Sequence, residues 1–124
     1  MSEIRSHRDL RVWQSSMELA ERVYALCRTW PNEERYRLSD QLIRAATSIP
    51  ANIAEGFSRG SAKDYARFLA IARGSTAECE TFIELAKRIG LIDEPTFNEM
   101  SELAGGIGRM LTALRRSVLA NSDR

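Results

Sequence analysis

Apolar residues recur along this chain at alternating steps of three and four, and this spacing predicts helices almost throughout. The clearest case, over residues 10–29, has two neighbouring apolar rows: Leu10, Trp13, Met17, Ala20, Tyr24 and Cys27, and Val12, Leu19, Val23 and Leu26. At about 100° per residue the two rows cover an arc of roughly 160°, which is wider than a single core-facing stripe needs. Trp30-Pro31 ends this helix, because the residue before a proline is pushed out of the α region.

The same spacing predicts three more helices, over residues 36–59, 62–89 and 94–119. Ser61 resembles an N-cap, and Pro95 suits the first turn of a helix. Strand signals are nearly absent. Four amphipathic helices with short connections predict an all-α fold, an antiparallel up-down-up-down four-helix bundle, as a single domain spanning residues 1–124.

Two stretches break the helical rules. Pro50 lies inside the second helix, where a proline removes a backbone donor at a cost of roughly 3 kcal/mol, so we expect a kink there. Gly105, Gly106 and Gly108 lie inside the fourth helix, where each glycine costs roughly 1 kcal/mol relative to alanine. They predict a weak or bent helix, or close approach by another backbone, and Gly74 invites the same close-packing interpretation.

A polar row follows one side of the second helix beside its apolar row. It consists of Gln41, Ser48, Asn52, Glu55 and Arg59, with Arg73 and Glu78 of the third helix as candidate partners. One interpretation is a structural hydrogen-bond network that fixes how the helices pair, and the other is a polar binding groove. We expect Asn52 and Glu55 to matter for folding or assembly before any activity.

Composition describes an ordinary soluble domain. The 124 residues are 44% apolar and carry a net charge of +1. The sequence shows neither a signal peptide nor an apolar run of the ~18 residues that a membrane helix requires, so we expect a cytoplasmic protein with no membrane role. Cys27 and Cys79 are isolated and suit buried positions in a reducing compartment.

Catalytic chemistry has little to build on. The single histidine, His7, is expected to be exposed in the N-terminal tail, so the paired Glu-x-x-His motifs of bundle enzymes cannot form. The Gly105–Gly108 stretch lacks the Gly-Lys-Ser/Thr ending of a phosphate loop. The sequence therefore predicts no enzymatic activity, no cofactor and no metal.

Sixteen of the eighteen basic residues are arginine, and they gather near both ends of the chain: Arg5, Arg8 and Arg11, and Arg109, Arg115 and Arg116. In an up-down-up-down bundle both termini emerge at one end, so these two clusters could form one patch for nucleic-acid phosphates or a partner. Alternatively, the C-terminal arginines only complement the helix dipole.

Self-association is indicated by the broad apolar arc of the first helix and by aromatic residues of the kind enriched at interfaces, namely Trp13, Tyr24, Trp30 and Phe57. The order of motifs then resembles a known family: Asp9-Leu10-x-Val12-Trp13, Trp30-Pro31-x-Glu33-Glu34, Leu38-x-x-Gln41, the nonapeptide Ser48–Gly56, then Arg59 and Gly74-Ser75 with Glu78. This is the bacterial four-helix-bundle family of proteins encoded in intervening sequences of 23S rRNA genes, historically labelled S23 ribosomal proteins. It is also similar to the accessory protein of diversity-generating retroelements.

The resemblance implies a homo-oligomer, typically a pentameric ring with a central pore, and a link to nucleic acid. The sequence as a whole predicts a non-enzymatic scaffold or adaptor that binds structured RNA or an RNA-handling enzyme through a ring of arginines. The alternative is a protein–protein interaction module with no nucleic-acid role.

Overall fold

The computed structural model describes residues 3–121, except for the side chains of residues 35 and 36. Four long α-helices dominate this part of the chain: α1 (Arg11–Cys27), α2 (Asp40–Ser58), α3 (Ala62–Arg88) and α4 (Glu94–Asn121). Short 3-10 turns cover His7–Asp9 and Asn32–Glu34. No strand occurs in the described residues, so the predicted all-α fold is confirmed.

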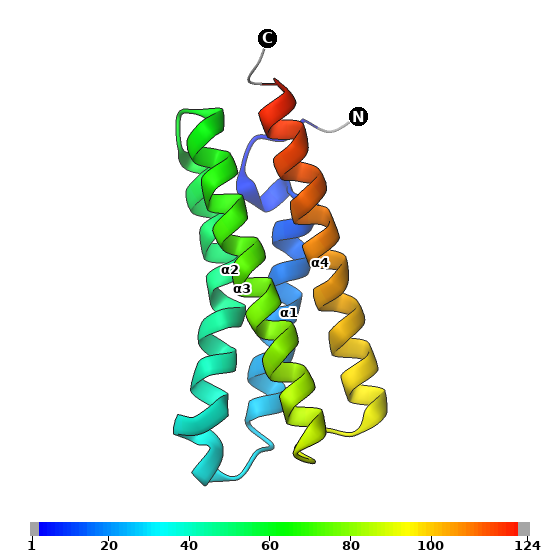
Figure 1. The fold of residues 1–124 in the computed structure, drawn as a ribbon. Coiled ribbons are helices and arrows are strands. Elements are labelled where there is room, and N and C mark those ends of the chain that lie inside the picture. The colour runs from blue at the N-terminus through cyan, green and yellow to red at the C-terminus, as the bar shows by residue number, and fades with distance from the viewer. Residues whose placement is uncertain (1–2, 122–124) are drawn as a thin grey trace.

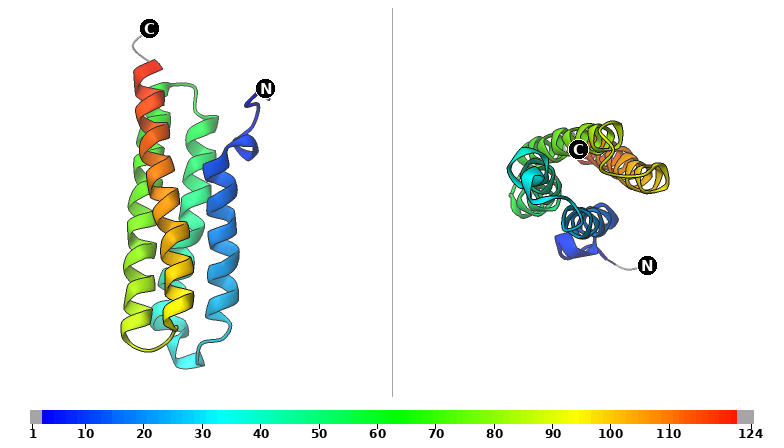
Figure 2. Two further views of the ribbon diagram at one scale, coloured as in Figure 1. Left: turned by 90° about the vertical axis from the view of Figure 1, so that its right-hand side faces the viewer. Right: turned by 90° about the horizontal axis from the view of Figure 1, so that it is seen from below.

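The four helices lie side by side along one axis (Figure 1). Seen along that axis they follow an arc, with α1 and α4 at its two ends and α2 and α3 between them (Figure 2, right). The start of α1 and the end of α4 lie at the same end of the molecule (Figure 1). No described helix is both long enough and apolar enough to cross a membrane.

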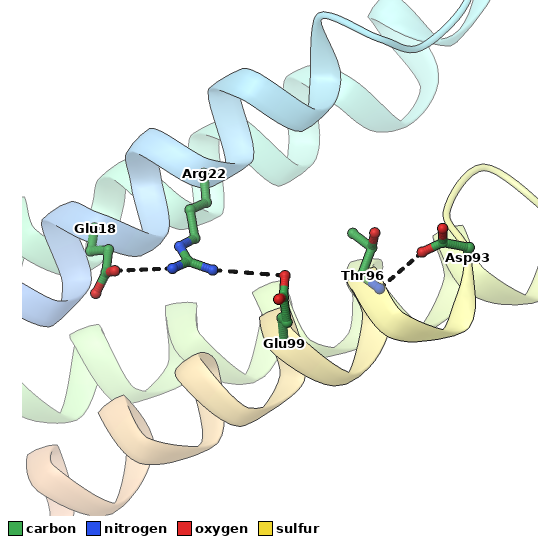
Figure 3. A network of polar contacts seen from close by, with 5 residues as sticks. All are labelled: Glu18, Arg22, Asp93, Thr96 and Glu99. Atoms are coloured by element: carbon green, nitrogen blue, oxygen red, sulfur yellow. Dashed lines mark hydrogen bonds and ion pairs between the residues drawn. The ribbon is translucent and has the colours of Figure 1, made fainter.

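Local signals set the helix ends. Ser61 Oγ accepts the N–H of Asp64 at 3.1 Å, and Asp93 Oδ1 accepts the N–H of Thr96 at 2.9 Å (Figure 3), so a short side chain caps each of α3 and α4. Hydrogen bonds from the side chain and backbone of Thr96 lower the pKa of the Asp93 carboxyl. Gly90, at φ 82°, supplies the left-handed residue that follows α3.

Two elements differ from the sequence-based expectation. The second helix begins with a π-helical turn over Arg35–Ser39, and its α-helical part starts only at Asp40. In addition, α4 continues without interruption through its three glycines. Beside those glycines, the described atoms nearest to an added Cβ belong to side chains, so the alternative of close approach by another backbone is wrong.

The core lies between the helices and takes fully buried side chains from all four. They include Leu19 and Val23 of α1, Leu42, Ile49 and Ile53 of α2, Leu69 and Ile83 of α3, and Ile107 and Leu111 of α4. Two fully buried hydroxyls inside this core are satisfied within their own helices, since Thr76 donates to the Ala72 carbonyl at 2.9 Å and Ser16 to the Trp13 carbonyl at 2.8 Å. No polar partner between helices is needed to bury either hydroxyl.

At the two ends of the arc, Arg22 connects α1 to α4 (Figure 3). Its guanidinium lies 3.2 Å from Glu18 Oε1 on the same helix and 4.0 Å from Glu99 Oε2 on α4. All three side chains are largely exposed, and exposed ion pairs contribute at most about 1 kcal/mol. Apolar packing therefore holds α1 and α4 in place, and the ion pairs add little.

Candidate interaction surfaces

The Ser48–Gly56 segment of α2 presents three different faces. Ile49 and Ile53 are fully buried in the core. Ser48 and Asn52 belong to the polar row beside α3, whereas Pro50 lines a groove on the outside, between α2 and α1. The helical repeat thus places polar, apolar and groove-lining residues within nine positions.

The polar face is a small hydrogen-bond network between α2 and α3. Ser48 Oγ and Ser75 Oγ lie 2.9 Å apart across the two helices. The Asn52 amide nitrogen donates to Ser48 Oγ at 2.9 Å and to the Ser48 carbonyl at 2.8 Å. The network fixes Asn52 against its own helix, and Ser48 makes the link to α3.

Gly56 is a point of close approach between α2 and α3. A Cβ added there would lie 2.8 Å from Phe68 Cβ and 3.2 Å from both Cδ1 and the carbonyl oxygen of Tyr65. Phe68 Cβ and the Tyr65 carbonyl oxygen cannot move away by a change of side-chain rotamer, because one is bonded directly to Cα and the other is part of the backbone. A side chain at residue 56 would therefore force the two helices apart.

The remaining residues of the predicted polar set lie apart from this network. Gln41 donates to the Arg37 carbonyl, and Glu55 forms an ion pair of 3.2 Å with Arg59 on the surface of the same helix. The Arg59 guanidinium also lies 4.9 Å from the centre of the Phe68 ring. Arg73 and Glu78 are both exposed on α3, and Arg73 faces α4, as described below.

The outer groove between α1 and α2 is almost entirely apolar. It encloses about 480 Å³ and is lined by His7, Trp13, Met17, Ala20, Glu21, Tyr24, Thr47, Pro50, Ala51 and Ala54. Met17 and Tyr24 are 37% and 45% exposed, which is high for large apolar side chains. The broad apolar arc of α1 is thereby explained: Val12, Leu19 and Val23 face the core, and Trp13, Met17 and Tyr24 face this groove.

His7 corrects one expectation. It belongs to a 3-10 turn that Ser6 and Asp9 cap reciprocally, it is half-buried, and its ring lies edge-on to Trp13 with 5.1 Å between centroids. The expected exposed tail position is therefore wrong. The sequence signal that could have located His7 is the capping box Ser6-x-x-Asp9 directly before the first helix.

A second groove, between α3 and α4, is polar and rich in arginine. It encloses about 460 Å³ and is lined by Arg73 and Glu80 of α3 and by Gly105, Gly108, Arg109, Thr112, Ala113 and Arg116 of α4. Two of the six arginines proposed from sequence as contact residues, Arg109 and Arg116, thus lie together. Arg73 joins them instead of the network of Ser48 and Asn52.

The other four proposed arginines lie outside this groove. Arg115 Nε donates to the Ala66 carbonyl at 3.0 Å and so ties α4 to α3. Arg5 lies 3.5 Å from Glu3, with both side chains almost fully exposed. Arg8 and Arg11 are exposed at the start of α1. The structure gives Arg115 a packing role and leaves the three N-terminal arginines on the surface.

Comparison with known proteins places the chain in a family. The model of the family described as 23S rRNA-intervening sequence protein matches residues 8–113. The chain belongs to this family. A crystal structure of a protein of unknown function from the S23 ribosomal protein family of Bacteroides thetaiotaomicron is 30% identical, with a TM-score of 0.79. That match covers 84% of this chain and 97% of the other. No curated protein matches the chain significantly.

Family membership confirms the resemblance identified from the motifs and supports the helical fold. It assigns no chemistry, and within the described residues no cluster of three or more histidine, cysteine, aspartate or glutamate side chains could hold a metal. Burial raises the pKa of the Cys79 thiol to about 12, with smaller contributions from Glu78 and Glu80. Desolvation likewise raises the pKa of Cys27. Both thiols therefore stay protonated near neutral pH and make poor nucleophiles.

Trp30 corrects another expectation. It lines a cavity of about 430 Å³ between the end of α1 and the start of α2, and its indole N–H is buried with no hydrogen-bond partner among the described residues. The residue belongs to the buried core, so it is not available as the interface aromatic that the sequence indicated. Burial of the indole could not be read from the Trp30-Pro31 pair, because it depends on tertiary packing.

Proposed function

We propose that this family member is a non-enzymatic scaffold or adaptor that self-assembles and binds structured RNA or an RNA-handling enzyme through its arginines. The assembly we propose is a ring, with a pentamer favoured by the family resemblance. Each subunit would repeat the same cluster of arginines around the ring, which multiplies a modest local charge into a larger field.

The apolar groove between α1 and α2 is the observation that carries the assembly. Exposed patches of contiguous apolar surface are typical of protein–protein interfaces, and Met17 and Tyr24 are types enriched there. The occupant we propose is a second copy of the chain, so the groove becomes buried when subunits associate.

The finer architecture belongs to the same proposal. We infer an up-down-up-down bundle as the repeating unit and a bend of α2 near Pro50, where the helix lacks one backbone donor. Such a bend would open the outer side of α2 at the groove that Pro50 lines.

A charge placed in the groove tests the assembly. Ala51 is exposed and lines the groove, so Ala51→Glu should block association without disturbing the core. Light scattering after size-exclusion chromatography should give an oligomeric mass for the wild-type protein and a monomer for the variant. Ala70→Glu, at an exposed position of α3 outside the groove, is the matched control and should keep the oligomer. A wild-type monomer at micromolar concentration would refute the assembly.

The alternative is a protein-interaction module with no nucleic-acid role, in which the same apolar groove holds a different protein. A partner protein that co-purifies after nuclease treatment, combined with no RNA binding at low salt, would favour this alternative. RNA binding that survives removal of every co-purifying protein would favour the scaffold.

A further inference from the structure

We propose that the groove between α3 and α4 is a binding site for the phosphodiester backbone of a nucleic-acid strand, held by Arg73, Arg109 and Arg116. This inference rests on the RNA-binding part of the proposed function and gives it a location. It also differs from the grouping predicted from sequence, in which Arg109 and Arg116 formed one patch with Arg115 and the N-terminal arginines, and Arg73 belonged to the polar network of the second helix.

The register of the two helices places Arg73 opposite Arg109. α3 and α4 run in opposite directions (Figure 1), Arg115 contacts the carbonyl of Ala66, and an added Cβ at Gly108 would lie 3.9 Å from Thr76 Cγ2. Residue numbers on the facing helices sum to 181 and 184 at these two contacts. By this register the Cα of Arg73 lies opposite residues 108–111, at about the level of Arg109 and about two turns from Arg116 along the axis.

Side-chain direction then brings Arg73 and Arg116 together. A helical side chain covers the turn that precedes its own Cα, so Arg116 leans toward Thr112 and Ala113. Arg73, on the antiparallel helix, leans in the opposite direction along the axis and reaches the same level. Thr112 and Ala113 both line the groove together with the two arginines, and this is the level at which we place a bound phosphate.

Arg109 lies over two glycines of α4. A Cβ built at Gly105 would lie 3.4 Å from Arg109 Nη1, and one built at Gly106 would lie 3.8 Å from Arg109 Nη2. The guanidinium of Arg109 therefore lies back along α4 over these two positions. Both distances are ordinary van der Waals contacts, so an alanine at either position would leave Arg109 in place.

The charges of the groove are not neutralised within the subunit. In the described part of the chain, Arg22, Arg59, Arg67 and Arg88 each have a carboxylate within 4.0 Å, whereas none lies that close to Arg73, Arg109 or Arg116. Among the described residues that line the groove, Glu80 is the one with an acidic side chain. Three guanidinium groups and one carboxylate give it a net charge of +2, while the whole chain carries only +1.

Spacing and composition of the groove favour a nucleic-acid backbone over a free nucleotide. Arg109 and Arg116 are seven residues apart, about 10 Å along the helix axis, which corresponds to about three nucleotides of a stacked strand. Guanidinium groups bind phosphate oxygens in a bidentate manner. None of the described residues that line the groove is aromatic, so they offer no platform on which a base could stack.

The test measures binding of a labelled single-stranded RNA of about 12 nucleotides at about 50 mM salt. Arg73→Gln, Arg109→Gln and Arg116→Gln should each weaken binding roughly fivefold or more, since each removes a charge-assisted contact. Glu80→Gln should strengthen binding, because it removes the only negative charge of the groove. Arg44→Gln, at an exposed position of α2, changes the net charge equally and should have little effect.

The outcomes separate this inference from the proposed function. If wild-type protein does not bind this single strand at low salt, the inference fails, and the proposed RNA-binding function fails with it only if a structured RNA does not bind under the same conditions either. If RNA binds but the three groove variants behave like Arg44→Gln, the groove assignment is wrong while RNA binding stands. Tripolyphosphate serves as a second probe: binding of tripolyphosphate without binding of RNA would identify a small-anion site and overturn the nucleic-acid assignment.

Discussion

Replacing Gly56 by alanine should destabilise the protein, although alanine is the better helix former. The added Cβ would lie 2.8 Å from Phe68 Cβ, whereas carbon atoms in contact prefer 3.5–4.0 Å. To relieve this overlap, α3 must move away from α2 by several tenths of an ångström. Overpacking of this kind costs about 1–3 kcal/mol, which exceeds the gain in helix propensity of up to about 1 kcal/mol.

Gly74→Ala is the matched control. Gly74 also lies inside an α-helix, but a Cβ added there meets no atom within 4 Å. This variant should be more stable than the wild type by about 0.5–1 kcal/mol, since only the propensity and chain-entropy gains remain.

Thermal unfolding followed by circular dichroism distinguishes the two variants. A stability change of 1 kcal/mol shifts the midpoint of a domain of this size by roughly 4 °C. We expect Gly56→Ala to melt several degrees below the wild type and Gly74→Ala a few degrees above it. Equal stabilisation by both substitutions would refute the close approach of α2 and α3 at Gly56.

Three further predictions concern the network, the cysteines and a helix cap. Asn52→Ala should cost about 1 kcal/mol in chemical denaturation because two hydrogen bonds are lost, whereas Glu55→Ala should stay within about 0.5 kcal/mol because its ion pair is exposed. Cys79 should react with a thiol reagent only as fast as the protein unfolds, and Cys27 faster, as mass spectrometry of labelled peptides would show. Because the pKa of Cys79 is raised, stability should fall as pH rises above about 9, where only the unfolded thiol ionises. Ser61→Ala should lower the unfolding free energy by about 1 kcal/mol through loss of the cap.

The sequence predicted the helices well because their apolar periodicity is strong and their ends carry local signals. Ser61 caps the start of α3 with its own side chain, and Gly90 ends the helix through its positive φ. Both effects depend only on neighbouring residues, so they can be recognised in the sequence. The π-helical turn before α2 was not predictable, because no local composition separates it from an ordinary helical turn. His7 was misplaced because its packing on Trp13 depends on how the N-terminal turn folds against α1.

Candidate site residues were harder to place. The polar row of α2 was read as one set, yet the structure joins Ser48 and Asn52 to Ser75 and leaves Glu55 at the surface. Helical periodicity gives the face on which a residue lies, but not which neighbour it reaches. For the same reason Arg73 was assigned to the polar network of α2, whereas the register of α3 and α4 brings it to Arg109.

The salt dependence of RNA binding tests the central claim most directly. For a single strand, the logarithm of the binding constant falls with the logarithm of the salt concentration, with a slope of about −0.7 per phosphate contact. Each contact that is lost therefore makes the slope shallower by about 0.7. Combining Arg73→Gln, Arg109→Gln and Arg116→Gln should therefore make the slope shallower by about 2 relative to the wild-type protein. A slope that is unchanged in this triple variant would show that the groove between α3 and α4 does not hold the phosphates.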